Sequence, residues 1–398
     1  MITIAIITWP FMGHINPTLS LGECLLAKGY RVIWISEKKE LNKLLPVGGE
    51  SIEIEGIEIE NNEKKDDEIS FTNNSFGMQS IQKLYERGFI PRNEKIYRQL
   101  QQVGKSLHID YIITDQQAFS GALYAHVNNI PFAVSVTTPA TIDPSIHFPE
   151  VLEYEKSQVL DFQHRMGCKV PEALVWHSPV TLIYTTKEFL QKENFPAHYY
   201  FVGPSINYRR ELNTDLFLSG KENRIRPLVL VSMGATIPCE SEFVEKIIQA
   251  FATLDVDVVL VANPEMKTGW PKNFHVFSYI PQLRVLEVVD LVVCHAGHNT
   301  VVEALNKGIP ILAIPIVHDQ SFIAGKIVDA GAGLRLKYKR LNSNQIENAV
   351  KQILINPKYR LAAQKIQKSF EHSGGGQRAA KIIESHIHQV LSHPISAQ

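Results

Sequence analysis

Short apolar segments typical of strands alternate with helix-like segments along almost the whole chain, and this alternation restricts the fold more than any other feature. The first repeat is a strand at 2–8, a helix at 17–29 and a second strand at 31–36. Asn16 is the expected N-cap of that helix and Pro17 its first residue, since proline lacks the N–H that a first turn leaves unpaired. Such repeats form parallel sheets covered by helices. We therefore predict an α/β fold.

The alternation occurs in two series, separated by a polar and charged segment. The first series continues with strands at 111–115, 131–136 and 180–186. The second contains strands at 227–234, 256–262, 274–279, 290–294 and 310–315. A chain of 398 residues is also too long for one ordinary core. We predict an N-terminal domain at 1–206, a linker at 207–226, a C-terminal domain at 227–370 and a helical segment at 371–398 that could pack back on the N-terminal domain.

Composition argues against several classes of protein. Lys plus Arg is 40 and Asp plus Glu is 41, so the net charge of -1 gives no reason to expect nucleic acid as a partner. The four cysteines are scattered without a CxxC pair, which favours a reducing compartment over a disulfide framework or zinc knuckle. Neither a signal peptide nor an apolar run long enough for a transmembrane segment is visible. We expect a soluble, cytoplasmic protein.

The loops after the strands are the expected place of chemistry, because open parallel sheets bind ligands beyond the carboxyl ends of their strands. In the second series His295 directly follows a strand, and Gly297 could let the backbone approach a ligand. Asn299 and Thr300 lie where the next helix should begin, and the unsatisfied N–H groups of a helix start attract phosphate. Alternatively, Thr300 and Glu303 form only a capping box. That alternative leaves the histidine unexplained.

Two other ligands can be considered for the same loop. His295 and His298 could indicate a metal, but no third ligand is evident and their spacing falls in a turn. A nicotinamide cofactor has little support, because the glycines do not form the GxGxxG fingerprint. Phosphate thus remains the favoured ligand.

In the first series, His14 lies in the first strand–helix loop and Asp115 ends the strand at 111–115. Although 101 positions separate them, both are expected on the same carboxyl edge of one sheet. A neutral imidazole can take a proton from a hydroxyl group, and a carboxylate on its other nitrogen fixes the tautomer. A lone histidine is more often structural; the aspartate is what favours a catalytic base.

The segment 278–324, which begins SYIPQLRVLEVVDLVVCHAGHNT, is similar to the donor-binding signature of glycosyltransferase family 1, the UDP-glycosyltransferase superfamily. The resemblance is closest to the bacterial branch with the macrolide glycosyltransferases, and it extends to 1–36 and 201–205. It implies a GT-B fold, in which two Rossmann-like parallel-sheet domains face a cleft. It also implies a nucleotide sugar as co-substrate.

The resemblance assigns the donor-binding roles. Tyr279, where the family usually has tryptophan, would stack on the nucleobase, with Gln282 near the nucleoside and Glu303 on the ribose hydroxyls. Asp319 and Gln320 resemble the pair that reads the sugar. The residues expected around the diphosphate are His295, Gly297, Asn299, Thr300, Ser232 and Gly234.

The resemblance further implies that His14 is the general base, oriented by Asp115, in an inverting transfer of a hexose to a hydroxyl of a small hydrophobic acceptor. Glucose from UDP-glucose is the first candidate for the donor. Trp9, Phe11 and Met12 would lie near the acceptor. The reaction needs no cofactor and no metal. The sequence Asp-Val-Asp at 255–257 matches a metal-binding motif of other glycosyltransferases, but it precedes a strand and is expected to be a solvated turn.

Three alternatives remain open at this point. The donor could be a dTDP-deoxysugar, although a full sugar-reading pair favours a sugar that keeps its hydroxyls. A UDP-sugar 2-epimerase shares the two-domain layout, but an acidic cluster for that reaction is missing. A non-catalytic nucleotide-binding helper would not need the pair of His14 and Asp115.

Overall fold

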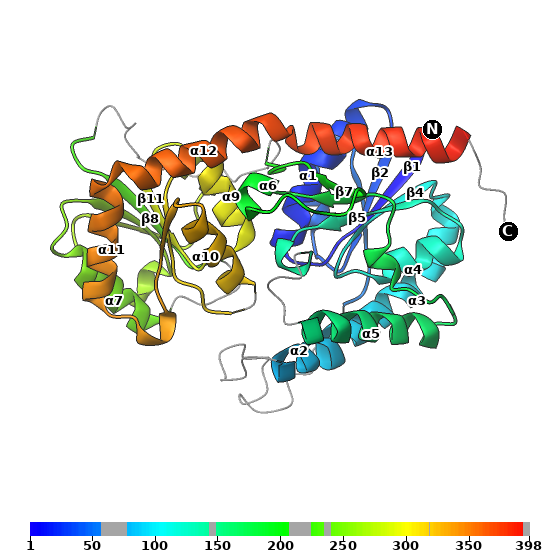
Figure 1. Cartoon of the computed structure of the whole chain (residues 1–398), viewed down its shortest axis with the longest axis horizontal. Helices are drawn as coiled ribbons and strands as arrows, with labels where there is room; N and C mark the ends of the chain where they lie inside the picture. Colours follow the sequence, from blue (N-terminus) through cyan, green and yellow to red (C-terminus); the bar gives the residue numbers. More distant parts are fainter. Residues whose placement is uncertain (57–77, 143–148, 207–223, 235–239, 318, 393–398) are drawn as a thin grey trace. The chain divides into compact units, whose positions relative to one another are not determined.

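The computed structural model describes residues 1–56, 78–142, 149–206, 224–234, 240–317 and 319–392 (Figure 1). The chain forms two compact units, each built on its own parallel sheet. The first contains 1–186, 194–210 and 373–398, and the second contains 187–193 and 211–372. Most of the predicted linker, 207–223, lies outside the described residues. The domain boundaries placed at 206 and 227 stay predictions.

The sheet of the first unit has the strand order β3-β2-β1-β4-β5-β6-β7 within the described residues. The strands are β1 (Thr3–Ile7), β2 (Arg31–Ser36), β3 (Glu50–Glu53), β4 (Tyr111–Asp115), β5 (Phe132–Val136), β6 (Thr181–Ile183) and β7 (Tyr199–Phe201). β1 pairs with β2 on one side and with β4 on the other. The chain order therefore reverses at β1, and such a reversal is where open parallel sheets place their ligands.

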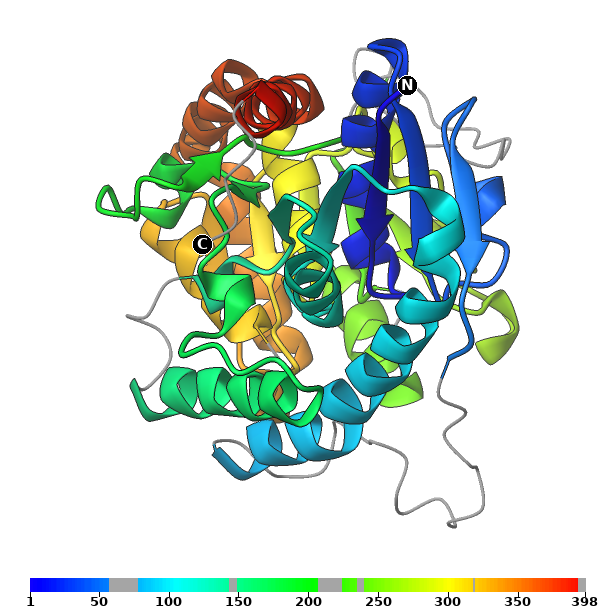
Figure 2. The ribbon, with the colours of Figure 1, turned by 90° about the vertical axis from the view of Figure 1, so that its right-hand side faces the viewer.

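Helices of the first unit are α1 (Met12–Ala27), α2 (Met78–Leu84), a π-helix at Tyr85–Phe89, α3 (Ile90–Leu107), α4 (Ser120–Val127), α5 (Pro149–Arg165) and α13 (Gly375–Ser392). The π-helix and α3 continue α2 as one helical path (Figure 2). α13 packs on α1, where Gly376 permits close contact: a Cβ there would lie 2.8 Å from the backbone of Ser20.

The start of α1 differs from the sequence prediction. The helix begins at Met12 with Phe11 as N-cap, so the predicted cap at Asn16 and first position at Pro17 are wrong. Pro17 lies inside the helix, where its missing N–H removes one hydrogen bond. Burial of Ile15 and Leu19 on this segment offsets that loss. His14 consequently lies in the first turn of a helix and not in a loop.

The second unit has the strand order β10-β9-β8-β11-β12-β13 within the described residues. Its strands are β8 (Leu228–Ser232), β9 (Asp257–Val261), β10 (Phe274–Phe277), β11 (Leu291–Cys294), β12 (Ile311–Ala313) and β13 (Gly333–Arg335). Its helices are α6 (Lys187–Leu190), α7 (Ser241–Phe251), α8 (Gln282–Val285), α9 (His298–Asn306), α10 (Gln320–Asp329), α11 (Ser343–Ile355) and α12 (Pro357–Ser373).

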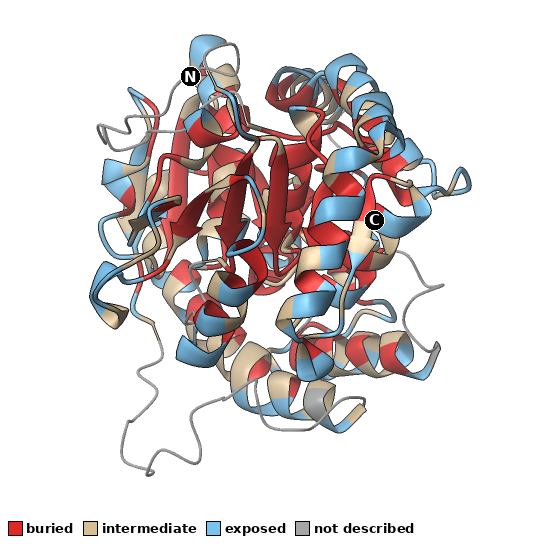
Figure 3. Cartoon of the chain, turned by 90° about the vertical axis from the view of Figure 1, so that its left-hand side faces the viewer, coloured by how far each residue is buried: buried red, intermediate tan, exposed pale blue. Residues whose placement is uncertain are grey.

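Burial explains which strands the sequence could predict. β1, β4, β8 and β11 are buried throughout, as expected for central parallel strands covered on both faces, and Figure 3 shows the strands in view largely in red. The short edge strands β7 and β13 were not predicted, because each has only one buried residue and therefore little apolar pattern. Among the described helices, none combines the length and hydropathy that a membrane-crossing segment requires.

Candidate active site

A histidine and a buried aspartate meet at the carboxyl edge of the first sheet. Asp115 ends β4, and His14 lies in the first turn of α1, which follows β1. The Nδ1 of His14 is 2.8 Å from Oδ2 of Asp115. The side chain of His14 is 12% exposed and that of Asp115 is 0% exposed. Since a carboxylate only accepts hydrogen bonds, Nδ1 carries the proton, and the Nε2 lone pair can accept a proton from another group.

Thr137 is a third member of this cluster that the sequence analysis missed. Its hydroxyl donates to Oδ2 of Asp115 at 3.2 Å and lies 2.8 Å from Nδ1 of His14. The backbone N–H of Gln117 donates to Oδ1 of Asp115 at 2.8 Å. Both carboxylate oxygens are thus engaged, which fixes the carboxylate under the imidazole. Its position in the sequence could have identified it, because Thr137 directly follows β5, the strand that pairs with β4.

The three residues expected near the acceptor differ in exposure. Phe11 is 47% exposed, Met12 is partly exposed and Trp9 is only 1% exposed. The ring of Trp9 packs edge-on against Phe89 at 5.4 Å, and the guanidinium of Arg92 lies 5.1 Å from its centroid. Within the first unit, Phe11 and Met12 therefore present surface, while Trp9 supports the side chains around it.

A second buried carboxyl group lies where α5 packs on the π-helix. Glu155 is 7% exposed and hydrogen-bonded to Tyr85, whose ring contacts Phe89 at 5.1 Å. Burial raises the pKa of Glu155 to about 7. Its Oε2 has no hydrogen-bond partner among the described residues. The sequence analysis missed this group, although its position four residues from both Val151 and Val159 places it on the apolar face of a helix.

In the second unit, His295 lies between two glycines at the carboxyl ends of β8 and β11. A Cβ on Gly234 would lie 2.6 Å from Cε1 of His295, and a Cβ on Gly297 would lie 2.5 Å from its Nε2. Both glycines therefore leave room for the imidazole itself. Ala296 has a φ of 66°, a conformation that few residues other than glycine adopt. Burial lowers the pKa of His295 to about 4, partly opposed by the backbone of Ser232, so the ring is neutral at pH 7.

Helix α9 begins one turn earlier than a capping box would require. Its first residue is His298, its N-cap is Gly297, and no side chain caps it. The alternative that Thr300 and Glu303 form only a capping box is therefore wrong. Asn299 and Thr300 lie in the first turn and are partly exposed, beside the N–H groups that a helix start leaves unsatisfied.

Of the residues expected around the nucleoside, Gln282 and Glu303 contact each other in the second unit. Gln282, at the start of α8, donates from Nε2 to Oε2 of Glu303 at 2.6 Å. Glu303 is 2% exposed, whereas Tyr279 is 48% exposed. This arrangement offers an aromatic face to a base and a buried, oriented carboxylate to hydroxyl groups.

The predicted sugar-reading pair lies at the start of α10. Gln320 is its first residue and Asp319 its N-cap. The Oε1 of Gln320 accepts hydrogen bonds from the N–H groups of Ile316 and Val317, at 2.8 and 2.9 Å. This side chain therefore holds its own loop, and only its Nε2 amide group could bind a sugar hydroxyl.

The Asp-Val-Asp sequence lies at the amino edge of the second sheet. Asp257 begins β9, and Asp255 pairs with Arg226 at 2.6 Å with its side chain 79% exposed. Among the residues that the structure describes, no three His, Cys, Asp or Glu side chains gather closely enough to hold a metal ion.

Several known proteins are similar to this chain in sequence or in fold. Residues 245–384 match the family described as Erythromycin biosynthesis protein CIII-like, C-terminal domain. NDP-glycosyltransferase YjiC of Bacillus subtilis is 29% identical, over 96% of both chains. The uncharacterized UDP-glucosyltransferase YojK of the same organism is 25% identical over 98% of both. The solved calicheamicin glycosyltransferase CalG4 has a TM-score of 0.77 and 20% identity over the whole of both chains.

Two Rossmann-like parallel sheets and these structural neighbours define the GT-B class of fold. The chain is a glycosyltransferase, and in sequence and fold it is similar to the enzymes of glycosyltransferase family 1. The resemblance and the fold class expected from the sequence are both confirmed.

Proposed function

We propose that the protein transfers glucose from UDP-glucose, with inversion, to a hydroxyl of a small hydrophobic acceptor. The observation that carries the proposal is the 2.8 Å contact between Nδ1 of His14 and Oδ2 of Asp115 at the carboxyl edge of the first sheet. It supplies an oriented base for the activation that an acceptor hydroxyl requires.

In this mechanism the acceptor oxygen forms a bond to the anomeric carbon while His14 Nε2 takes its proton. The bond from that carbon to the diphosphate breaks, and UDP leaves with the electron pair. A single displacement from the opposite face inverts the anomeric configuration. Asp115 stabilises the imidazolium that forms, and a base of this kind contributes ~10² to 10⁴ in rate.

The donor would be held by the second unit. Helix α9 would present its first N–H groups to the diphosphate, and His295, neutral at pH 7 because burial lowers its pKa to about 4, would contribute a hydrogen bond in place of a charge. Ser232, Asn299 and Thr300 would complete this set, with Tyr279 on the base.

Glucose is supported by the amide of Gln320, which a sugar lacking hydroxyls would leave unpaired, and by the name of the relative YojK, a UDP-glucosyltransferase. The name of the calicheamicin enzyme supports a natural product as the acceptor. The exposed side chain of Phe11 supports an apolar acceptor. A comparison of UDP-glucose with dTDP-sugars as donors distinguishes this proposal from the competing one, in which the donor is a dTDP-deoxysugar.

The test combines a panel of phenolic, polyketide and terpenoid acceptors with UDP-glucose, dTDP-glucose and dTDP-rhamnose, and detects products by mass. We expect glucosylated products, a β-linkage by NMR and a rate at least ~10² lower for His14→Ala. UDP affinity by calorimetry should be unchanged, because His14 acts on the acceptor. A His14→Ala rate above one tenth of wild type would refute the base, and exclusive use of dTDP-rhamnose would refute glucose.

We further propose that transfer is independent of metal, because the α9 start and its side chains supply the partner of the diphosphate. The expected result is full activity after dialysis against EDTA. Restoration of a chelated, inactive enzyme by Mg²⁺ or Mn²⁺ would contradict the proposal.

A further inference from the structure

Helix α12 carries three cations and a leucine in a row on its outer side, and none has a part in the reaction proposed above. Lys358, Leu361, Lys365 and Lys368 are spaced so that, at ~100° per residue, they fall within about 80° of the helix circumference. All four are exposed, Leu361 to 63%. We call these four residues the α12 stripe.

The lysines of the α12 stripe lack the carboxylate partners that lysines on two other helices of the second unit have. Lys246 on α7 and Lys351 on α11 pair with a glutamate four residues earlier, at 2.7 and 2.6 Å. Within the described part of the chain, the stripe lysines form no ion pair. Residues 357–392 hold six Lys and Arg against two Glu, in a chain whose net charge is -1. Positive charge is therefore concentrated on the last two helices.

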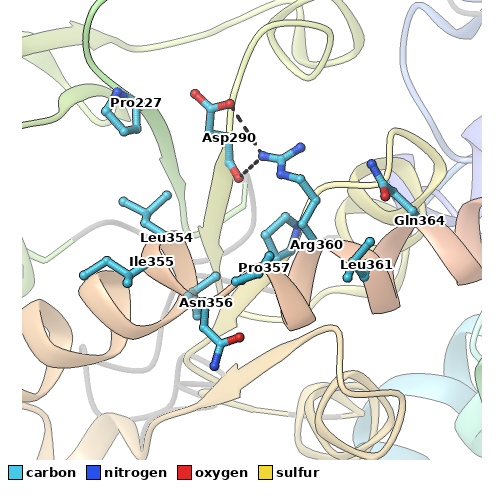
Figure 4. A pocket seen from close by; sticks show the side chains of 11 residues that line it. Pro227, Asp290, Leu354, Ile355, Asn356, Pro357, Arg360, Leu361 and Gln364 are labelled. Carbon is cyan, nitrogen blue, oxygen red and sulfur yellow. Dashed lines mark hydrogen bonds and ion pairs between the residues drawn. The ribbon is translucent and has the colours of Figure 1, made fainter.

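Apolar surface continues from the stripe into an open hollow of about 340 Å³ between the end of α11 and the start of α12 (Figure 4). Ile355, which is 79% exposed, and Leu361 line this hollow. The guanidinium of Arg360 donates to the backbone carbonyl of Asp290 at 2.7 Å and so fixes α12 against the sheet. Leu361, the next residue of α12, is thus held at the surface.

We propose that the α12 stripe and Ile355 dock the second unit on an anionic lipid bilayer. Cations beside exposed aliphatic side chains on one helix face are typical of helices that lie in a membrane interface. The lysine stems can extend along the apolar contact while their ammonium groups reach the headgroups. A nucleic acid would use the lysines but would leave Leu361 and Ile355 exposed to water. The proposal does not depend on which sugar or acceptor the protein uses.

The test is sedimentation of the full chain with vesicles of phosphatidylcholine alone or mixed with phosphatidylglycerol. We expect binding only to the anionic vesicles, weakening as salt rises from 50 to 300 mM. The triple variant Lys358→Glu, Lys365→Glu, Lys368→Glu should lose at least roughly tenfold in affinity. Leu361→Ser should weaken binding several-fold without changing its salt dependence, because it removes apolar contact only.

The matched control is Lys105→Glu, Lys169→Glu, Lys272→Glu, which changes the net charge equally at exposed lysines outside α12. It should bind like the wild type, and all variants should keep the wild-type melting curve and UDP affinity. Absence of binding to anionic vesicles, or equal losses in stripe and control variants, would overturn the proposal. The proposal would also be overturned if the protein bound heparin as tightly as vesicles and Leu361→Ser left the affinity unchanged. That result would indicate a polyanion other than a lipid as the partner.

Discussion

The carboxylate of Glu303 is buried, yet the helix that carries it does not use it as a cap. Helix α9 starts at His298, and Glu303 lies past its first turn, bonded instead to Gln282 at 2.6 Å. A buried carboxylate is costly unless it is hydrogen-bonded, and the amide of Gln282 supplies such a bond. At the scale of single residues, the structure thus excludes a capping box at Glu303, and its role in ribose binding stays a prediction.

Glu303→Gln should therefore weaken UDP binding without unfolding the helix. The amide oxygen can still accept from Gln282, but the ribose hydroxyls would lose a charged acceptor. Hydrogen bonds to charged groups are worth about 1.5–3 kcal/mol, so affinity should fall roughly 10- to 100-fold. Calorimetric titration with UDP and an unliganded melting curve measure the two effects. Unchanged affinity would remove Glu303 from the ribose site, and a lower melting temperature would show that the substitution disturbs folding.

At the scale of helices and strands, the sequence predicted the types of most elements but not the starts of two helices at the site. Buried central strands such as β4 and β11 have long apolar runs, which identify them directly. The starts of α1 and α9 contain glycine and histidine, which local preference assigns to loops. Tertiary packing extends both helices backwards. Thr137 and Glu155 were missed because contacts between elements, absent from local pattern, give them their roles.

The contact of α5 with the π-helix predicts a pH-dependent stability. Burial raises the pKa of Glu155 to about 7 from 4.5, so the folded state binds the proton more tightly than the unfolded state. This contribution to the free energy of unfolding is complete below pH 4.5 and is lost as pH rises through 7, by on the order of 3 kcal/mol. Urea unfolding at pH 5 and pH 8 should show this loss for the wild type and a smaller one for Glu155→Gln.

The control for that measurement lies on the same helix. Glu153 has a side chain 76% exposed, so Glu153→Gln should leave the wild-type difference between pH 5 and pH 8 in place. An equal difference in the wild type and in Glu155→Gln would show that Glu155 does not titrate in this range.

At the scale of the whole molecule, the two units have separate cores, and the C-terminal helix belongs to the first of them. Ala379, Ala380, Ile383 and Ile387 of α13 are buried in the core that contains β1 and β2. The N–H of Gly375 donates to the carbonyl of Val202 at 2.7 Å, and Lys28 pairs with Glu384 at 2.7 Å. Along the sequence, the second unit is therefore inserted between the main part of the first unit and the helix that completes it. Stability of the first unit should depend on contacts between residues as far as 356 positions apart.

Ile383→Ala tests that dependence. Ile383 is 0% exposed against the first sheet, so truncation should leave a cavity and cost about 2–5 kcal/mol of the first unit's stability. Scanning calorimetry with and without UDP can assign the transitions, because UDP bound to the second unit should raise only that unit's melting temperature. The variant should lower the other transition and keep the wild-type UDP affinity. Leu391→Ala, on the same helix but 51% exposed, should change neither transition. A drop confined to the UDP-sensitive transition would show that α13 supports the second unit instead, because only the unit that loses the buried side chain should melt earlier.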